Sequence, residues 1–248
     1  MTAKGHSNKV KLFAKQHLFP GPDLHTRCRY KVLPKLMRKG DLETLDAGFG
    51  NGALSYAAFR MGNRVVGISN RQPEVTATTQ LFESLEIPTD AIDLRALDLY
   101  DLEKLGRSFD QIICSETLEH IRDDRRIIDL FARMLKPKGR LVLCCPFALH
   151  PEHALGRIDE PEDGGHVRDG YTLETYRALL EPAGLQIIKH VGLGSSWLCA
   201  LDRIERSARN RFGPLISLPV FLAMWPLTMF DYQDPKVPFS LAVVAEKL

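Results

Sequence analysis

The amino-acid sequence predicts an α/β fold, in which a doubly wound parallel sheet is covered by helices on both faces. Three observations support this prediction. Short apolar runs alternate with helical patterns along the chain, as in βαβ units. A glycine turn, D-A-G-F-G-N-G at residues 46–52, follows the first apolar run and precedes a helical pattern. A nearly continuous apolar run at residues 140–145 is typical of a strand buried on both faces.

The expected strands and helices alternate from residue 43 onward. Strands are expected at Glu43–Ala47, Arg64–Ile68, Ile92–Leu97, Phe109–Cys114, Arg140–Cys145, Leu185–Val191 and Ser240–Ala245. Helices are expected at Ala53–Met61, Pro73–Leu85 and Asp123–Leu135, and a fourth helix opens at Thr172. Proline is tolerated in the first helical turn, so Pro73 does not oppose the second helix. The turns Lys136-Pro-Lys-Gly139 and Pro182-Ala-Gly184 are expected to end the last two helices.

The N-terminal segment is basic and predicted to be helical. Apolar residues at helical spacing predict an amphipathic helix at Ser7–Phe19, ended by Pro20-Gly-Pro22, and a second helix at Leu24–Met37 with a kink near Pro34. The first 40 residues contain ten Lys or Arg and one Asp, so the remainder is net acidic. No apolar core of signal-peptide length is present. A solvated arm is expected, with contact to an anionic substrate or a membrane surface as the alternative. Nucleic acid is not an expected partner, because no aromatic residues interleave with the charge.

A segment between the last two expected strands is unusually long and apolar. Residues 197–211 predict an amphipathic helix whose charged residues face outward, namely Asp202, Arg203, Glu205, Arg206 and Arg209. The uncharged run Pro214–Phe230 contains Trp225 and is interrupted by Pro219 and Pro226, so it is too short and too broken to span a membrane. It is interpreted as a lid over a hydrophobic acceptor, as an interfacial patch that reaches a lipid, or as core packing or a homodimer interface.

The chain is long enough to bury a substantial core. Four segments are predicted: an N-terminal helical cap at residues 1–40, a ligand-binding core at 41–193, the apolar helical insert at 194–237, and the last core strand at 238–248. The five cysteines form no C-x-x-C pair. This pattern indicates reduced, mostly buried thiols in a cytoplasmic protein, with membrane association as an alternative suggested by the insert.

The glycine turn is the strongest functional signal. Gly48, Gly50 and Gly52 remove side chains that would block a ligand, and Asp46 offers a carboxylate to the turn or to a cationic ligand. The nicotinamide fingerprint places its third glycine one step later. The D-x-G-x-G-x-G form resembles motif I of class I S-adenosylmethionine (SAM) methyltransferases. A turn that only joins a strand to a helix is the alternative.

Further stretches resemble the same family in the same order. Asp98-Leu99 follows the third strand, Phe109–His120 is similar to motif IV, and residues 135–143 resemble the turn and strand that come next. The stretch Gly165–Tyr171 is similar to one found in small-molecule methyltransferases. The resemblance implies a Rossmann-like sheet of seven strands with the last strand antiparallel, N-terminal helices over the pocket, and SAM as cofactor.

The resemblance also implies which residues bind SAM. Asp98 accepts the adenine amino hydrogen, the Leu99 amide faces a ring nitrogen, and residues after the fourth strand, such as Ser115, line the methionine part. Arg27 or Arg29 could meet the SAM carboxylate. The second strand ends in Ser69 and Asn70, where most members carry an acid for the ribose hydroxyls. A neutral partner binds a hydroxyl more weakly than a charged one. The absence of an acid at this position is similar to the form seen in cyclopropane fatty-acid synthases.

Methyl transfer from SAM is a nucleophilic displacement, so the protein mainly aligns the reactants and excludes water. A hydroxyl acceptor also needs a base, and histidine suits that role near neutral pH. Among the histidines after the fourth and fifth strands, His166 is favoured, because it sits in the long loop expected to face the acceptor. His120 is second, with Glu116 and Glu119 nearby. His150 and His153 are the other candidates. No metal is expected, because the spacing of His150 and His153 is poor and no second cluster completes a ligand set.

The favoured function is SAM-dependent methylation, directed to oxygen, of a hydrophobic small-molecule or lipid-linked acceptor. One alternative is methylene transfer to a lipid alkene as in cyclopropane synthases, because Cys28, Glu119 and His120 are of the types that hold a bicarbonate base in those enzymes. Another is a non-catalytic partner subunit with the methyltransferase fold, suggested by the missing ribose acid.

Overall fold

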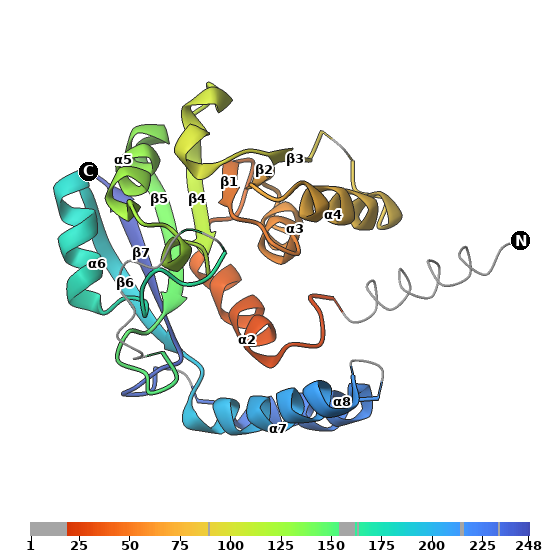
Figure 1. Cartoon of the computed structure of the whole chain (residues 1–248). Helices are drawn as coiled ribbons and strands as arrows, with labels where there is room; N and C mark the ends of the chain where they lie inside the picture. The colour runs from red at the N-terminus through yellow and green to blue at the C-terminus, as the bar shows by residue number, and fades with distance from the viewer. Residues whose placement is uncertain (1–18, 89, 154–161, 163, 214–215, 233) are drawn as a thin grey trace, which may run out of the picture.

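A computed structural model describes residues 19–88, 90–153, 162, 164–213, 216–232 and 234–248. The helix expected at Ser7–Phe19 lies outside these residues apart from Phe19. The described chain forms one mixed sheet with helices on both faces (Figure 1). This arrangement confirms the predicted α/β fold.

The sheet has seven strands in the order β3-β2-β1-β4-β5-β7-β6. Their bounds are β1 Glu43–Ala47, β2 Arg64–Ser69, β3 Ile92–Ala96, β4 Phe109–Ser115, β5 Leu135–Pro146, β6 Leu185–Leu193 and β7 Ser240–Lys247. Strands β1 to β5 pair in parallel, whereas β7 inserts between β5 and β6 and is antiparallel to both. The order therefore reverses between β1 and β4, which is where doubly wound sheets bind ligands.

Helices connect these strands. The α-helices are α2 Leu24–Val32, α3 Ala53–Arg60, α4 Gln72–Ser84, α5 Asp124–Met134, α6 Leu173–Leu180, α7 Ser196–Phe212 and α8 Leu218–Leu227. Short 3₁₀ helices are η1 Leu33–Leu36, η2 Leu99–Leu105, η3 Leu118–His120, η4 Glu181–Ala183 and η5 Thr228–Phe230. The kink expected near Pro34 is the change from α2 to η1, because proline cannot donate the next helical hydrogen bond.

Two large apolar clusters cover the two faces of the sheet. One lies beneath α5 and α6 and includes Phe131 and Tyr176, which are both fully buried. The other lies beneath η1, α3 and α4 and includes Leu36 and Phe82. Burying a phenylalanine side chain contributes about 2 to 3 kcal/mol. Because both faces are covered, the strand ends are held rigidly and the turns that follow them have fixed positions.

Strand β5 begins five residues earlier than the sequence predicts. Lys136-Pro-Lys-Gly139 was expected to be a turn, but the strand starts at Leu135, and the pairing with β4 shifts register between Phe109 and Gln111. Two long-range contacts explain the difference. Leu135 pairs with Phe109 in the core, and the Lys136 ammonium lies 2.8 Å from the Asp110 carboxylate.

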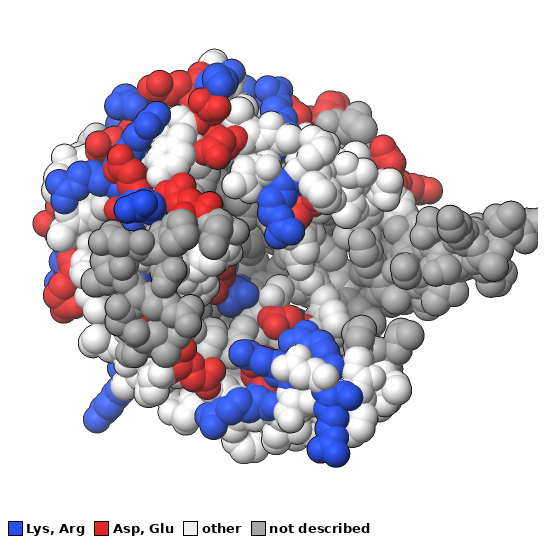
Figure 2. Space-filling model, viewed as in Figure 1, with Lys and Arg blue, Asp and Glu red and all other residues white. Residues whose placement is uncertain are grey.

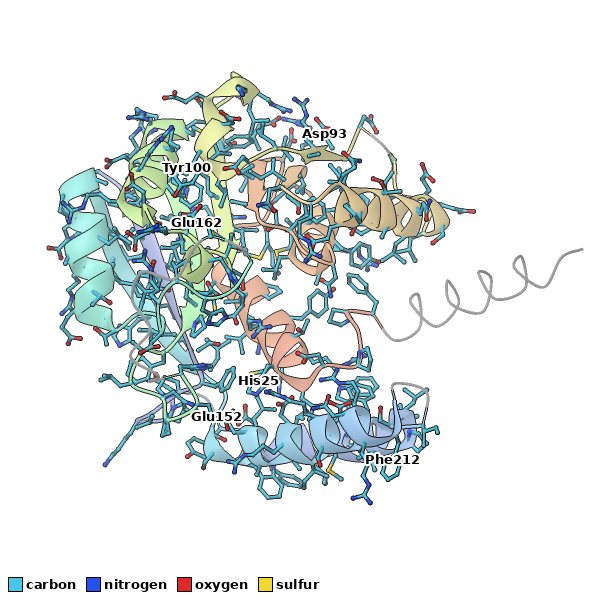
Figure 3. All side chains as sticks on the ribbon, in the orientation of Figure 1. His25, Asp93, Tyr100, Glu152, Glu162 and Phe212 are labelled. Carbon is cyan, nitrogen blue, oxygen red and sulfur yellow. The ribbon has the colours of Figure 1, made fainter. Side chains whose placement is uncertain are left out.

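The insert between β6 and β7 forms α7 and α8, and two details differ from prediction. Asp202 and Glu205 were expected to face outward, but each is only 1% exposed. Helix α7 packs against α2, so these carboxylates point into the protein, where Arg206 pairs with Asp202 and His25 lies 3.6 Å from it. Figure 3 labels His25 on the side of α2 that faces α7. Pro219 does not interrupt the apolar run, because it occupies the first turn of α8, whereas Pro226 lies inside that helix.

Among the described residues, no helix combines the length and the apolar content needed to cross a bilayer.

Candidate functional site

A cavity of about 340 Å³ opens at the carboxyl ends of β1 to β4. Four turns form its walls: Gly48 and Gly50 after β1, Ser69, Asn70 and Glu74 after β2, Leu97 to Tyr100 after β3, and Glu116, Thr117 and His120 after β4. Glu162 and Gly164 reach it from the chain beyond β5. We call this cavity the strand-tip crevice. It lies where the strand order reverses, so most of the residue sets predicted from sequence meet in one place.

The glycine turn after β1 is shaped by its neighbours. Gly48 has φ +87°, and a Cβ there would lie 2.3 Å from Thr117 Oγ1. Gly52 caps α3 with φ +76°, and a Cβ would meet Thr78 and Phe82 of α4. Gly50 also has positive φ, but no atom lies within 4 Å of its Cβ position. Gly48 and Gly50 therefore face the crevice, whereas Gly52 brings α3 against α4.

Some backbone amides of this turn donate hydrogen bonds to carbonyls inside the protein. The amides of Gly48 and Phe49 both donate to the Ile68 carbonyl, at 3.0 and 3.1 Å. They tie the turn to β2, and the Gly52 amide donates to the Phe49 carbonyl at 2.8 Å, so a ligand would meet the other amides of the turn and the open space above Gly50. The sequence alone did not distinguish these two groups of amides.

Asp46 lies behind the turn and does not line the crevice. Its carboxylate is 1% exposed and accepts a 2.6 Å hydrogen bond from the Ser55 hydroxyl of α3. Burial raises the pKa of Asp46 to about 6, although the Ser55 hydrogen bond opposes the shift. The carboxylate therefore joins β1 to α3, and a direct contact with a ligand in the crevice is not part of this arrangement.

The turn after β2 brings a carboxylate that the sequence argument overlooked. Ser69 and Asn70, two of the predicted SAM-binding residues, line the crevice, and so does Glu74 from the first turn of α4. The Ser69 hydroxyl donates to Glu74 Oε2 at 2.8 Å and accepts from the Arg71 amide at 3.1 Å. Glu74 could have been found from sequence as an acidic residue in the first turn of the helix that follows β2.

The turn after β3 carries Asp98 and Leu99, both predicted to bind SAM, into the wall of the crevice. Asp98 caps η2 by accepting a 2.8 Å hydrogen bond from the Tyr100 amide, which fixes the carboxylate at the rim. The Tyr100 hydroxyl donates to Glu162 at 2.8 Å, and the two side chains lie together in Figure 3. This contact joins the crevice wall to the segment that follows β5.

The turn after β4 is held by contacts from α2 and β7. Glu116 has φ +53°, its carboxylate lies 3.3 Å from the Arg29 guanidinium of α2, and it accepts from the Ser240 hydroxyl at 3.2 Å. Arg29 therefore reaches the crevice wall through Glu116. Arg27 does not, because it donates to the Gly21 carbonyl and stacks on Trp225. Ser115 lies at the end of β4, and its carbonyl accepts from the Thr117 hydroxyl at 3.1 Å.

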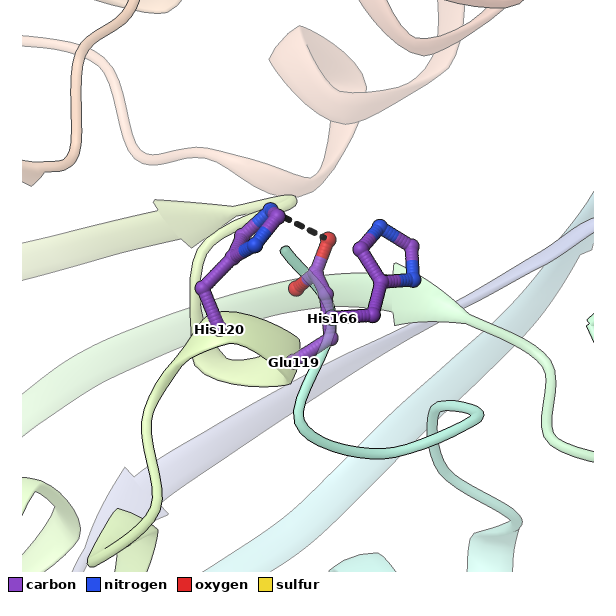
Figure 4. Close-up of side chains that lie close together, drawn as sticks. All are labelled: Glu119, His120 and His166. Atoms are coloured by element: carbon purple, nitrogen blue, oxygen red, sulfur yellow. Dashed lines mark ion pairs between the residues drawn. The ribbon is translucent and has the colours of Figure 1, made fainter. Parts of the chain in front are cut away.

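Glu119, His120 and His166 meet at one edge of the crevice (Figure 4). His120 Nδ1 lies 2.9 Å from the Gly165 carbonyl. A carbonyl can only accept, so Nδ1 carries the hydrogen and neutral His120 has an unprotonated Nε2, 3.9 Å from Glu119 Oε1. The His166 ring packs edge-on against His120, with 4.8 Å between ring centroids. Of these two histidines, His120 lines the strand-tip crevice.

Glu119 is a buried residue whose carboxyl lies between the two histidine side chains in Figure 4. It is 1% exposed, and neither of its oxygens has a hydrogen-bond partner among the described residues. Burial, followed by the charge of Glu116, raises the pKa of Glu119 well above its ordinary value. Ligand atoms of Glu119, His120 and His166 lie within 4.8 Å of one another, a donor set that a divalent cation accepts. From sequence, His150 and His153 were the candidates for a metal, and no metal was expected there.

His150, His153 and Cys28 lie outside the crevice. The two histidine rings pack against Phe239, and His153 Nε2 lies 3.1 Å from the Phe239 carbonyl. Cys28 lines a separate cavity beside Trp225, its thiol lies 3.8 Å from Asp231, and burial raises its pKa to about 11. The cysteine of the cyclopropane-synthase alternative is therefore not brought together with His120.

Comparisons with known proteins agree with this geometry. Residues 45–143 match the model of the methyltransferase domain family. The ubiquinone biosynthesis O-methyltransferase of Xanthomonas axonopodis pv. citri is 34% identical over 168 residues, covering 64% of this chain and 69% of that protein. The mitochondrial ubiquinone biosynthesis O-methyltransferase of Homo sapiens is 27% identical over 161 residues, covering 61% of this chain and 43% of that protein. Other relatives are matched over as little as 38% of their length.

Solved structures share the fold. A SAM-dependent methyltransferase from Aquifex aeolicus superimposes with a TM-score of 0.56 at 15% identity, covering 97% of this chain and 98% of that one. The N-methyltransferase NodS from Bradyrhizobium japonicum gives a TM-score of 0.58 at 17% identity, covering 90% and 96%. At these identities the likeness concerns the fold alone.

Proposed function

The chain belongs to the class I SAM-dependent methyltransferases, and from this premise we propose that it methylates a hydroxyl group of a hydrophobic acceptor. The methyl donor is SAM. The observation that carries the choice of oxygen and of an apolar acceptor is the 34% identity to a ubiquinone biosynthesis O-methyltransferase over 69% of that relative. The apolar α7–α8 insert is consistent with an acceptor that partitions into lipid.

We propose that SAM lies across the strand-tip crevice. Its amino-acid tail runs over the turn at Gly48 and Gly50 and past Ser115, and its adenine sits beside Asp98 and the Leu99 amide. Its ribose faces the turn after β2, where Ser69 and Asn70 stand. The cavity is lined by Gly48, Gly50, Ser69, Asn70, Asp98 and Leu99, which supports this placement.

We propose His120 as the base, with His166 as the second candidate. The acceptor oxygen attacks the methyl carbon, the carbon–sulfur bond breaks, and the hydroxyl proton passes to His120 Nε2. The products are the methyl ether and S-adenosylhomocysteine. His120 is preferred because it lines the crevice and its Nδ1 is held by the Gly165 carbonyl, which leaves Nε2 free of a proton. Burial raises the pKa of Glu119 well above its ordinary value, and its Oε1 lies 3.9 Å from His120 Nε2.

The test is methyl transfer from labelled SAM by the purified full-length chain. The acceptors are a short-chain prenylated catechol, a prenylated aniline of the same size and vesicles of unsaturated phospholipid. We expect label in the catechol ether and little in the other two. Label only in the aniline would redirect the chemistry to nitrogen. Loss of the lipid double bond with gain of a CH₂ group would establish the cyclopropane-type alternative.

We further propose that the α7–α8 insert rests on an anionic lipid surface when the enzyme meets its acceptor. Most of the exposed large apolar side chains among the described residues lie between residues 197 and 237, including Met229 at 70% and Phe230 at 66% exposure. No charged residue occurs between Gly213 and Phe230. Aromatic and aliphatic side chains exposed in this way suit the interface of a bilayer.

The charge around this surface favours anionic lipid over a second protein copy. Helix α7 carries Arg203, Arg206, Arg209 and Arg211, and its two acidic residues, Asp202 and Glu205, pair with Arg206 and Arg209, so the helix keeps an excess of basic charge. Figure 2 shows basic side chains beside uncharged surface where α7 and α8 lie. Each basic residue near an anionic surface contributes about 1 kcal/mol of attraction.

Vesicle co-sedimentation tests the surface. We expect binding to vesicles of phosphatidylcholine with phosphatidylglycerol, weaker binding to phosphatidylcholine alone, and loss of binding in the Met229→Ser/Phe230→Ser variant. Leu149→Ser is the matched control, because Leu149 is 65% exposed and lies outside the insert. Absence of vesicle binding, together with concentration-dependent dimerisation that the double variant abolishes, would assign this surface to a second copy instead.

A further inference from the structure

The turn after β2 has no acid at the strand end, yet it presents a carboxylate to the crevice. Ser69 occupies the strand end, and its hydroxyl already serves two partners inside the protein. It donates its single proton to Glu74 Oε2 and accepts from the Arg71 amide. The hydroxyl therefore has no proton left for a ligand and only one lone pair. Its main effect is to hold Glu74 in place.

Glu74 lies where its carboxylate can contact a ligand above the turn after β2. Its side chain is 30% exposed and lines the strand-tip crevice together with Asn70 and Gly50. It also lines an adjoining cavity of about 480 Å³ that shares Gly50 with the crevice. Besides the Ser69 bond, Glu74 Oε1 lies 3.0 Å from an Arg71 guanidinium nitrogen. Each carboxylate oxygen keeps a second lone pair for a further donor.

We propose that Glu74 binds the two ribose hydroxyls of SAM, in the role that the missing strand-end acid would have filled. This inference rests on the proposed placement of SAM in the crevice. A carboxylate and a cis diol match in spacing, so both hydroxyls can donate to one carboxyl group. Hydrogen bonds to an ionised acceptor are roughly twice as strong as neutral ones. The carboxylate comes from the first turn of α4 instead of the last residue of β2.

The surroundings of Glu74 favour a negative charge at this position. Glu74 lies in the first turn of α4, where the helix dipole favours an anion. Arg71 is the paired cation, but its side chain is 71% exposed, so it does not cover the carboxylate. Gln72 in the same turn is exposed and does not line the crevice. Glu74 is therefore the residue of this turn with both the charge and the position that the ribose requires.

Affinity for S-adenosylhomocysteine, measured by isothermal titration calorimetry, tests the proposal. We expect Glu74→Gln to weaken binding about 10- to 100-fold, because one charged acceptor of two hydroxyls is lost. Glu83→Gln is the matched control: it removes the same charge from the same helix at an exposed position outside the crevice, and should change affinity less than about twofold.

A ligand lacking the hydroxyl shows whether Glu74 acts on the ribose itself. The 2′-deoxyribose analogue of S-adenosylhomocysteine should bind wild type about tenfold more weakly than the parent, but should bind Glu74→Gln nearly as well as the parent does. The variant Ser69→Asp/Glu74→Gln should recover much of the lost affinity, because it restores an acid at the strand end.

The outcomes separate this inference from the proposed function. No binding of S-adenosylhomocysteine by wild type at millimolar concentration would remove the proposed SAM site as a whole. Normal binding by wild type with an unchanged Glu74→Gln variant would remove the role of Glu74 alone. Equal loss for the parent and the deoxy ligand in Glu74→Gln would also remove it, since the effect would then be indirect. The comparison of the two ligands on wild type needs no variant to fold.

Discussion

The strand-tip crevice and the α7–α8 insert are built in different ways. In the crevice, each turn follows a strand of a sheet covered on both faces, and the backbone itself sets the shape, as at Gly48 with its positive φ and close approach to Thr117. In the insert, α7 packs on α2 and α8 packs on α7, and apolar side chains such as Phe230 are left exposed. The crevice is therefore suited to hold a small ligand in one orientation, whereas the insert is suited to a broad apolar partner.

The largest expected effect concerns the base at the crevice. His120→Ala should lower kcat by about 10²- to 10⁴-fold and leave the affinity for S-adenosylhomocysteine unchanged, because the base acts only in the chemical step. His166→Ala is the matched control and should lower kcat by less than about tenfold. Steady-state kinetics with a saturating hydroxylated acceptor measures both. A larger loss in the His166 variant would make His166 the base, as the sequence argument favoured.

The glycine turn gives the next largest effect. Gly48→Ala should destabilise the protein by about 2 to 4 kcal/mol, because its Cβ would clash with Thr117 and its φ is positive. Gly50→Ala should cost only about 1 to 2 kcal/mol, because the left-handed backbone is its sole penalty. Urea unfolding of the two variants provides the measurement. Equal losses would mean that packing against Thr117 does not shape the crevice.

The raised pKa of Asp46 predicts that the stability of the protein depends on pH. The expected change in unfolding free energy is similar to or smaller than that for Gly48→Ala. The pKa of Asp46 is raised from 3.8 to about 6 in the folded protein, so the folded state binds more protons than the unfolded state between these values. Its contribution is favourable below about pH 4 and is lost as pH rises through 6. Two units of pKa correspond to about 3 kcal/mol. The stability of Asp46→Asn relative to wild type should therefore rise by about that amount from pH 4 to 7, and a constant difference would contradict the assignment.

The smallest effect is expected on the outer face of the insert. Phe230→Ser should change the unfolding free energy by less than about 0.5 kcal/mol and leave methylation of a dissolved acceptor unaltered. Its activity should fall only when the acceptor is presented in anionic vesicles. Phe221→Ala is the contrast within the same insert, because Phe221 is fully buried and should cost about 3 kcal/mol. Loss of activity on the dissolved acceptor in Phe230→Ser would make the insert part of the catalytic site.

The fold and the positions of the crevice turns could be predicted from sequence because local residues determine them. The bounds of β1 match the predicted Glu43–Ala47, and the crevice contains the predicted Gly48, Asp98 and Ser69. The alternation of strands and helices and the glycine turns depend on residues that are close in sequence. They can therefore be predicted before it is known which strands and helices pack together.

The errors at Asp202, Glu205 and Lys136 to Gly139 involve contacts between distant segments, whereas the omission of Glu74 concerns a local contact. Asp202 and Glu205 show helical spacing that suits an outward face, but α2 covers that side of α7. Lys136 to Gly139 have turn composition, but pairing of Leu135 with Phe109 draws them into β5. Glu74 was overlooked because only the strand end was searched for an acid, and its hydrogen bond to Ser69 is visible only in three dimensions.

A crystal structure of the full chain with S-adenosylhomocysteine tests the central claim most directly. The account predicts the nucleoside across the tips of β1 to β4, with adenine against Asp98, ribose hydroxyls within hydrogen-bonding distance of Glu74, and the amino-acid tail above Gly50. Electron density for the ligand elsewhere on the molecule, with the strand-tip crevice left empty at saturating ligand, would contradict it.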